Sequence, residues 1–287
     1  IQTYKNYYNS CVKERFGDVK IDKIKGADIQ AFYNDLTKKG RKLSTIKVVK
    51  AFMSSCLKQA VKDELIARNP FDATSLPRKA GDTMGRIAMT REEQELFMEY
   101  AKESFLYNLF AVMLRTGMRS GEARDLRWSD IDKKQNVIHV TRTLQYINGV
   151  GFIDDAPKTK TSIRDIPLTA EVLKLLENQK NYWGFKVEKI DRYLFCDADG
   201  NPINVHLLQA EIDKTVKRIH EDGKEFPRIT SHVFRHTFAT RAIEAGMQPQ
   251  VLKTIMGHSS LAMTMDLYSH VLPDTKAEEM QKIANVF

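Results

Sequence analysis

A stretch without apolar periodicity, residues 77–86, separates two parts of the chain that should fold independently. It contains a proline, two glycines and four charged residues, a composition that is typical of linkers. A Thr-x-x-Glu capping box, Thr90 to Glu93, follows it and marks a new helix. A length of 287 residues also suits one to two domains. We therefore predict a helical domain over residues 1–77, a linker over 78–88 and a second domain over 89–287.

The first part carries two helical patterns. We expect Asp28 to N-cap a helix that runs to about Thr37 and ends at Gly40. A longer helix should open at Ser44 or Thr45 and run to about Leu65. Its apolar positions are spaced for burial at Ile46, Val49, Phe52, Met53, Cys56 and Leu57.

Charge is distributed unevenly along the chain. The net charge is +8 and the isoelectric point is about 9.2, which favours a polyanionic partner such as nucleic acid. Residues 1–77 hold fifteen Lys or Arg and eight Asp or Glu, a net charge of +7. A solvated basic face is the plainer alternative, but few acids interrupt the basic run. We predict DNA contact by six residues at and after the helix–helix turn: Lys38, Lys39, Arg41, Lys42, Lys47 and Lys50.

The second part is predicted to be mainly α-helical with a small antiparallel β-sheet. One strand is expected over 137–146, followed by an Asn148-Gly149 turn and a second strand that leads to Pro157. A third strand is expected over 163–168. Helices are expected at about 169–182, 205–221, 231–245, 249–256, 260–269 and 275–286.

Several classes of protein are disfavoured by the composition. The three cysteines are widely spaced, which disfavours a disulfide framework or a cysteine zinc site and fits a reducing cytoplasm. No apolar run approaches 18 residues and no signal peptide opens the chain, so we expect no membrane association. The chain begins at Ile1 inside a predicted helix, and we expect it to be a fragment that lacks N-terminal residues.

Four segments carry residues suited to chemistry on a phosphate. In TGMRSGE (116–122), glycines on both sides of Arg119 can fix a guanidinium for bidentate phosphate binding. The alternative is an arginine that tethers its own loop through Glu122. In SHVFRH (231–236), His232 and Arg235 share a helix face and can converge on one anion.

The remaining alternatives are plainer structural roles. His232 and His236 have the spacing of a metal pair, but Val233 stands where a zincin needs Glu, so we expect no metal. His258 follows a short helix and could simply cap its C-terminus. A lone tyrosine such as Tyr268 on an amphipathic helix is usually a packing residue.

In combination, these pieces resemble the tyrosine recombinase (phage integrase) family, nearest to integrases of conjugative transposons and temperate phages of Gram-positive bacteria. The resemblance covers essentially the whole chain, and its specificity lies in the order of the motifs. They are TGMRSGEARDLRW (116–128), PKTKTSIRDIPL (157–168), SHVFRHTFAT (231–240) and GHSSLAMTMDLYSHV (257–271).

The resemblance implies a helical core-binding domain and a mixed α/β catalytic domain that form a C-shaped DNA clamp. It also implies integration and excision of a mobile element by strand cutting and rejoining through a covalent 3′-phosphotyrosine, without metal, ATP or other cofactor. An N-terminal domain that binds arm-type DNA sites would precede such a chain. The catalytic residues that it implies are Arg119, Lys158 (or Lys160), His232, Arg235, His258 and the nucleophile Tyr268.

The implied partners are double-stranded core-site DNA and three further copies of the chain. Residues 276–287 carry an apolar stripe that would dock on a neighbouring copy, or else pack on their own domain. An accessory DNA-bending or excision protein is a further expected partner. Two other functions stay open at this point: a type IB topoisomerase, which shares this chemistry, and a catalytically silent DNA-binding protein.

Overall fold

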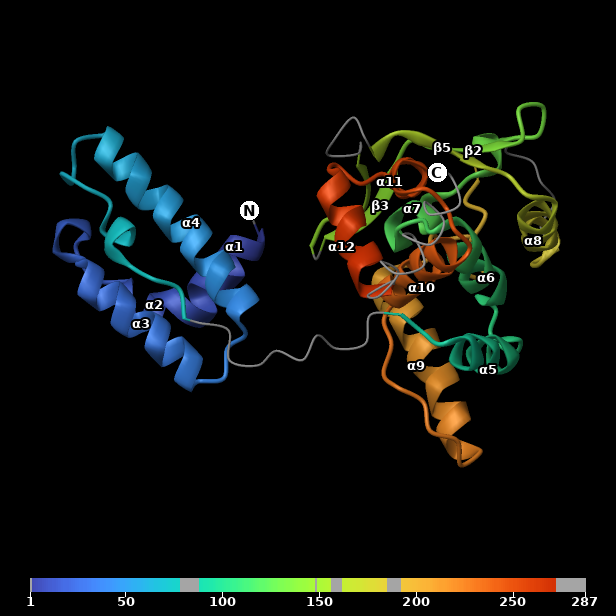
Figure 1. Ribbon diagram of the computed structural model, residues 1–287, viewed down its shortest axis with the longest axis horizontal. Helices are drawn as coiled ribbons and strands as arrows, with labels where there is room; N and C mark the ends of the chain where they lie inside the picture. Colours follow the sequence, from blue (N-terminus) through green and yellow to red (C-terminus); the bar gives the residue numbers. More distant parts are fainter. Residues whose placement is uncertain (1, 78–87, 148, 156–161, 185–191, 272–287) are drawn as a thin grey trace, which may run out of the picture. The chain divides into compact units, whose positions relative to one another are not determined.

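The computed structural model describes residues 2–77, 88–147, 149–155, 162–184 and 192–271 (Figure 1). The chain divides into two compact units, Ile1–Gly85 and Arg86–Phe287. In the parts that the structure describes, no helix is both long enough and apolar enough to cross a membrane.

The N-terminal unit is built from helices around an apolar core of its own. Phe16 and Phe32 meet edge to face in this core, with ring centroids 5.2 Å apart, and Tyr33 and Val49 are fully buried beside them. The elements are α1 (Gln2–Tyr7), a π-helical turn (Tyr8–Val12), α2 (Lys13–Phe16), a 3₁₀ turn (Ile21–Lys23), α3 (Gly26–Lys38), α4 (Leu43–Lys62) and a 3₁₀ turn (Pro70–Ala73).

Two local predictions in this unit are wrong. Asp28 does not N-cap α3: it is the third helical residue, and its carboxylate accepts from the backbone N–H of Lys25 at 3.0 Å. The helix therefore begins earlier than its most obvious capping residue. Cys56 is exposed, because the buried stripe of α4 passes beside it through Met53 and Leu57. Gly40 ends the preceding helix as predicted, at a φ of +71°.

The C-terminal unit contains two small antiparallel sheets. Strands β1 (Ile131–Asp132), β2 (Val137–Val140) and β5 (Arg164–Pro167) form one in the order β1-β2-β5. Strands β3 (Thr143–Ile147) and β4 (Gly151–Asp155) form the other.

The prediction of a single strand over residues 137–146 is therefore wrong. It breaks after Val140, and Arg142 in the break places Nη2 at 2.8 and 2.7 Å from the two carboxylate oxygens of Asp130. The strands on either side of Lys158 and Lys160 belong to different sheets, so they are not partners in one hairpin. Both lysines lie outside the described residues.

Helices pack beside these sheets, and helices and strands together enclose the main core (Figure 1). Phe97, Phe110 and Phe234 pack together at its centre, with ring centroids 5.3–5.5 Å apart. Thr90 and Glu93 form the predicted capping box. The predicted helix at 275–286 lies outside the described residues. The helices are α5 (Arg91–Ala101), α6 (Tyr107–Thr116), α7 (Ser120–Asp125), a 3₁₀ turn (Trp128–Asp130), α8 (Ala170–Asn181), α9 (Val205–Glu221), α10 (Ser231–Glu244), α11 (Pro249–Met256) and α12 (Leu261–Val271). The expected fold, mainly helical with small antiparallel sheets, is confirmed.

Candidate active site

The turn between α6 and α7 sets the position of Arg119. α6 ends at Gly117, whose φ of +63° is left-handed and strained for any residue with a side chain. A Cβ atom at Gly117 would also lie 2.3 Å from Cδ1 of Phe238 on α10. The chain therefore turns in little space, and Arg119 becomes the residue that immediately precedes α7.

Arg119 is fixed on two sides. Its backbone N–H donates to Oε2 of Glu122 at 2.8 Å, and its Nη1 donates to Oε1 at 2.7 Å. Its Nη2 donates to the Gly257 carbonyl at 2.9 Å. The loop tether through Glu122 considered above is thus present, but the same guanidinium also reaches the end of α11.

Arg235 is buried on the inner face of α10. Its Nη1 donates to the Gly117 carbonyl at 2.6 Å and its Nη2 to the Met256 carbonyl at 2.5 Å. Burial, and after it the positive charge of Arg119, lowers the pKa of Arg235 to about 9. The side chain is still protonated at neutral pH, and the repulsion indicates that an anion between the two guanidiniums would be stabilised.

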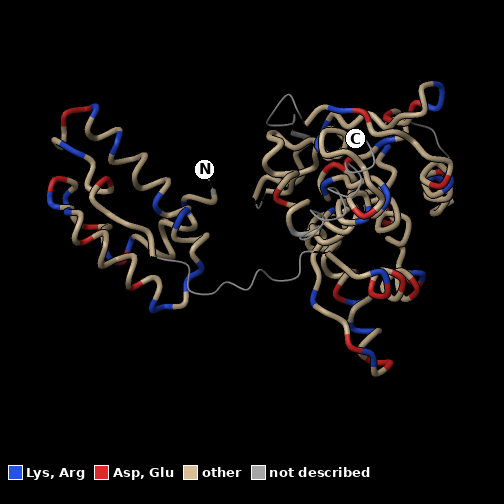
Figure 2. The backbone as a smooth tube through the Cα atoms, in the orientation of Figure 1, with Lys and Arg blue, Asp and Glu red and all other residues tan. Residues whose placement is uncertain are grey.

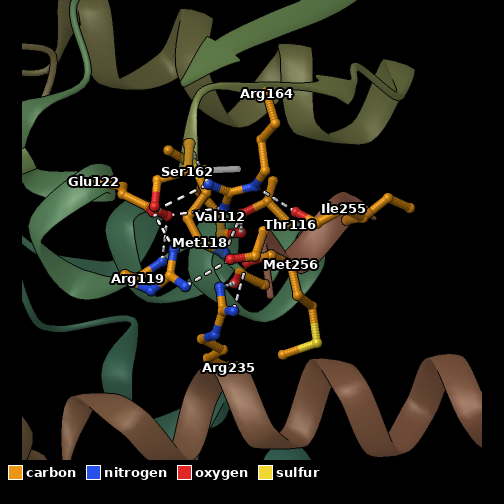
Figure 3. Close-up of polar contacts among 12 residues, drawn as sticks. Val112, Thr116, Met118, Arg119, Glu122, Ser162, Arg164, Arg235, Ile255 and Met256 are labelled. Carbon is orange, nitrogen blue, oxygen red and sulfur yellow. Dashed lines mark hydrogen bonds and ion pairs between the residues drawn. The ribbon is translucent and has the colours of Figure 1, made fainter. Parts of the chain in front are cut away.

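A third arginine, Arg164 on β5, belongs to the same cluster. Its Nη1 and Nη2 donate to Oε1 and Oε2 of Glu122 at 3.0 and 2.8 Å, and its Nε donates to the Ile255 carbonyl at 2.5 Å. Figure 3 shows Arg164 and Arg119 reaching Glu122, while Arg235 points from α10 toward Met256 at the end of α11. Arg164 was not among the residues predicted from the sequence to act on a phosphate, although it lies in one of the four family motifs.

The cluster carries an excess of positive charge. Burial raises the pKa of Glu122, but the hydrogen bonds and charges of Arg164, and then of Arg119, outweigh burial and lower it overall. The carboxylate is therefore ionised and balances one of three guanidiniums. Such a preorganised, partly buried group of donors is suited to the charge that develops on a phosphate in a transition state.

His258 joins this cluster from the segment after α11. The imidazole is 7% exposed, and its Nδ1 lies 2.9 Å from the hydroxyl oxygen of Thr264 on α12. Burial, followed by the charges of Arg235 and Arg119, lowers the pKa of His258 to about 4. The ring is therefore neutral at neutral pH and can donate one hydrogen bond without adding charge.

The two histidines of the third motif, residues 231–240, lie on α10. His232 is exposed at the start of the helix, one turn before Arg235. His236 is half-buried, and burial, with the nearby His232 and Arg235, lowers its pKa. Within the described ranges, no group of His, Cys, Asp and Glu is arranged to hold a metal ion.

Tyr268 packs on α12 against a small cluster that includes Ile243 and Leu252. Its hydroxyl donates to the backbone carbonyl of Met247, in the turn between α10 and α11. Burial raises the pKa of this half-buried phenol. The structure thus brings Arg119, Arg235 and His258 together, but it gives the Tyr268 hydroxyl a backbone partner in place of the arginines.

The basic residues predicted to contact DNA lie around the turn between α3 and α4 and along α4. Figure 2 shows Lys and Arg gathered at this turn. Five of the six are exposed and Lys50 is half-buried, while Lys39 has an ion pair with Glu14 at 3.5 Å.

Comparisons with known proteins identify the family of the chain. Residues 88–274 match the phage integrase family, and residues 1–37 match the family described as phage integrase, N-terminal SAM-like domain. The transposase from transposon Tn916 of Enterococcus faecalis is 28% identical, over 94% of this chain and 69% of that protein. The ICEBs1 integrase of Bacillus subtilis is also 28% identical, over 98% of this chain and 76% of that protein.

A solved structure resembles the whole chain. It is that of the Tn1549 transposon integrase in complex with a circular intermediate DNA, with a TM-score of 0.87 and 30% identity, and the match covers 97% of this chain and 92% of that one. With the family match over 88–274, this likeness establishes that the chain belongs to the phage integrase family and is a tyrosine-type site-specific DNA recombinase.

Proposed function

We propose that this recombinase integrates and excises a mobile DNA element, and that its arginine cluster binds the scissile phosphate. The observation that carries the proposal is the convergence of Arg119 and Arg235 on adjacent carbonyls at the end of α11, beside neutral His258. Arg119 and Arg235 hold the non-bridging oxygens, and His258 donates a further hydrogen bond. Because arginine stays protonated, these side chains supply positive charge to the transition state throughout the reaction.

Tyr268 is the proposed nucleophile. Its phenolic oxygen forms a bond to phosphorus, the bond from phosphorus to the 5′ oxygen breaks, and a 3′-phosphotyrosine results. His232 accepts the phenolic proton, and a lysine of residues 157–168 donates a proton to the leaving 5′ oxygen. Lys158 is our first choice for this general acid, with Lys160 as the alternative. A second DNA 5′-hydroxyl then reverses these steps and reseals the strand.

The hydrogen bond between Tyr268 and the Met247 carbonyl must break before this attack. The phenolic oxygen is engaged as a donor there, and burial raises its pKa, which disfavours the phenolate. Both effects keep the nucleophile unreactive until DNA is bound. Cleavage therefore requires α12 or the turn at Met247 to shift so that the hydroxyl faces phosphorus.

Exchange between two duplexes takes four cleavages, so we propose a homotetramer on double-stranded core-site DNA. The apolar stripe within residues 276–287 is the proposed contact to a neighbouring copy. An accessory DNA-bending or excision protein is a further proposed partner, and the substrate implies action in the bacterial cytoplasm.

A covalent-trapping experiment tests the proposed function. The chain is mixed with a nicked duplex that contains the circular junction of its own mobile element, so that cleavage releases a short fragment and cannot reverse. We expect a denaturant-resistant protein–DNA adduct from the wild type and from the control Tyr182→Phe, since Tyr182 is an exposed tyrosine outside the site. Tyr268→Phe should form none. An adduct from Tyr268→Phe would show that the nucleophile is another residue.

A further inference from the structure

The C-terminal end of α11 is a shared anchor for the arginine cluster. Three consecutive carbonyls, those of Ile255, Met256 and Gly257, each accept a hydrogen bond from a different arginine: Arg164, Arg235 and Arg119 respectively. Carbonyls at a helix C-terminus lack intrahelical partners and carry the negative end of the helix dipole. They are therefore good acceptors for guanidinium groups that come from three other elements.

Arg164 differs from Arg119 in its exposure. The Arg164 side chain is 3% exposed and Glu122 is 4% exposed, whereas the Arg119 side chain is 35% exposed. Arg164 is thus enclosed by protein, and Arg119 is open to a ligand. Arg235 is also buried, but its Nη atoms donate to backbone carbonyls, whereas both Nη atoms of Arg164 donate to the carboxylate of Glu122. Because its charge is already balanced by Glu122, Arg164 is placed to act through Glu122 and α11 and not on DNA itself.

The two arginines divide the carboxylate of Glu122 between them. Oε1 accepts from Nη1 of both Arg164 and Arg119, and Oε2 accepts from Nη2 of Arg164 and the backbone N–H of Arg119. With Arg164 in place, Glu122 cannot turn both oxygens toward the Arg119 guanidinium. The Arg119 guanidinium therefore keeps N–H donors, and a positive charge that Glu122 does not fully balance, for binding a phosphate.

We propose that Arg164 is a positioning residue for strand cleavage, which shares Glu122 with Arg119 and fixes both to the end of α11. The inference rests on the proposed function, in which Arg119 binds the scissile phosphate. Loss of Arg164 would leave a buried carboxylate with Arg119 as its one guanidinium partner. Glu122 would then draw the Arg119 guanidinium away from DNA and neutralise it.

The test is the single-turnover rate of adduct formation on the nicked duplex, measured at saturating protein together with DNA affinity and thermal stability. We expect Arg164→Gln to slow adduct formation by about 10²-fold, the size of effect that a small misplacement of a catalytic group produces. DNA affinity should change little, because Arg164 does not face the duplex. Arg164→Lys keeps the charge but not the planar fork, and it should fall between wild type and Arg164→Gln.

A double variant separates positioning from a merely structural role. Adding Glu122→Gln to Arg164→Gln removes the unbalanced carboxylate, and we expect the rate to recover by roughly tenfold over the single variant. A merely structural role would show in the double variant as recovery of the melting temperature alone, because Glu122 would no longer be a buried unpaired charge. Positioning shows as recovery of the rate per folded molecule. Arg142→Gln is the matched control, because Arg142 also pairs with a carboxylate, Asp130, but outside the cluster. It should cleave at the wild-type rate.

The outcomes distinguish this inference from the proposed function. The role of Arg164 is overturned, and the proposed function is not, by the following result. The wild type forms an adduct that depends on Tyr268, and the Arg164 variants form it more slowly only in proportion to the folded protein that they lose. Failure of the double variant to recover also overturns it. If Arg164→Gln does not fold, Arg164→Lys carries the test alone, and a wild-type rate per folded molecule in that variant overturns the inference. Absence of any wild-type adduct overturns the proposed function and this inference together.

Discussion

Gly117 combines a left-handed backbone with a close approach to Phe238, and these two constraints can be separated. Gly246, after α10, has a similar φ of +78°, but no atom lies within 4 Å of a Cβ built there. Gly246→Ala should therefore show only the backbone strain, roughly 1–2 kcal/mol. Gly117→Ala adds the clash with the Phe238 ring, so we expect a larger fall in melting temperature. We also expect loss of the covalent adduct, since Arg119 follows in the same turn.

The clash itself has a direct check. Phe238→Leu shortens the crowding side chain and should restore part of the melting temperature lost in Gly117→Ala, while leaving Gly246→Ala unchanged. Equal melting temperatures for Gly117→Ala and Gly246→Ala would show that the Phe238 ring does not oppose a side chain at position 117.

Residues differ in how far their own sequence neighbourhood reveals their role. Gly40 and the Thr90 capping box follow local rules of helix ends, and the structure bears them out. Arg164 does not, because its partners Glu122 and Ile255 stand 42 and 91 residues away along the chain. The local sequence shows only a charged residue in a short strand. The burial of the Arg164 side chain depends on tertiary packing.

At the level of elements, the sequence predicted kinds of structure better than their connections. From Ile138 to Tyr146 every second residue is apolar except Arg142, so the pattern over 137–146 predicts one strand. The ion pair of Arg142 with Asp130 lies at the point where β2 and β3 separate into two sheets. Likewise, helix α12 was expected from its apolar spacing, but the bond from Tyr268 to the Met247 carbonyl depends on how α12 packs beside α10.

The pairing of β2 with β5 should respond to pH through His139. This residue lies opposite Asp165 in the register, with Nδ1 2.7 Å from the carboxylate. The hydrogen bond to Asp165 raises the pKa of His139 against the effect of desolvation, and the charges of Asp165, Asp132 and Asp130 add to it. A raised folded pKa means that the stabilisation is fully present below about 6.5 and is lost as pH rises through the folded value.

We therefore expect His139→Gln to lower the melting temperature more at pH 5.5 than at pH 9. Thermal unfolding of the wild type and the variant at both values measures this difference. In an Asp165→Asn background the pH dependence of the difference should shrink, because the largest cause of the shift is gone. A difference that is constant with pH would exclude the ion pair as a source of sheet stability.

For the whole molecule, the uneven distribution of charge has a measurable consequence. Residues 1–77 carry a net +7 of the total +8, so this part should contribute most of the phosphate contacts. Each phosphate contact releases counterions, and the logarithm of the binding constant falls with the logarithm of salt by about 0.9 per contact on duplex DNA. The slope of log K against log salt therefore measures the number of phosphate contacts. Net charge away from the DNA changes mainly the rate of association.

Two quadruple variants with the same loss of charge distinguish contacts from net charge. The first replaces Lys38, Arg41, Lys42 and Lys47, which are exposed near the α3–α4 turn, by Gln. The second replaces Lys102, Lys133, Lys214 and Lys217, each of which is paired with a glutamate on the C-terminal unit. We expect the first to reduce the salt slope by roughly 3–4 and the second to leave it near wild type. Equal reductions in the two would mean that the basic residues around α3 and α4 act as general charge and do not hold phosphates.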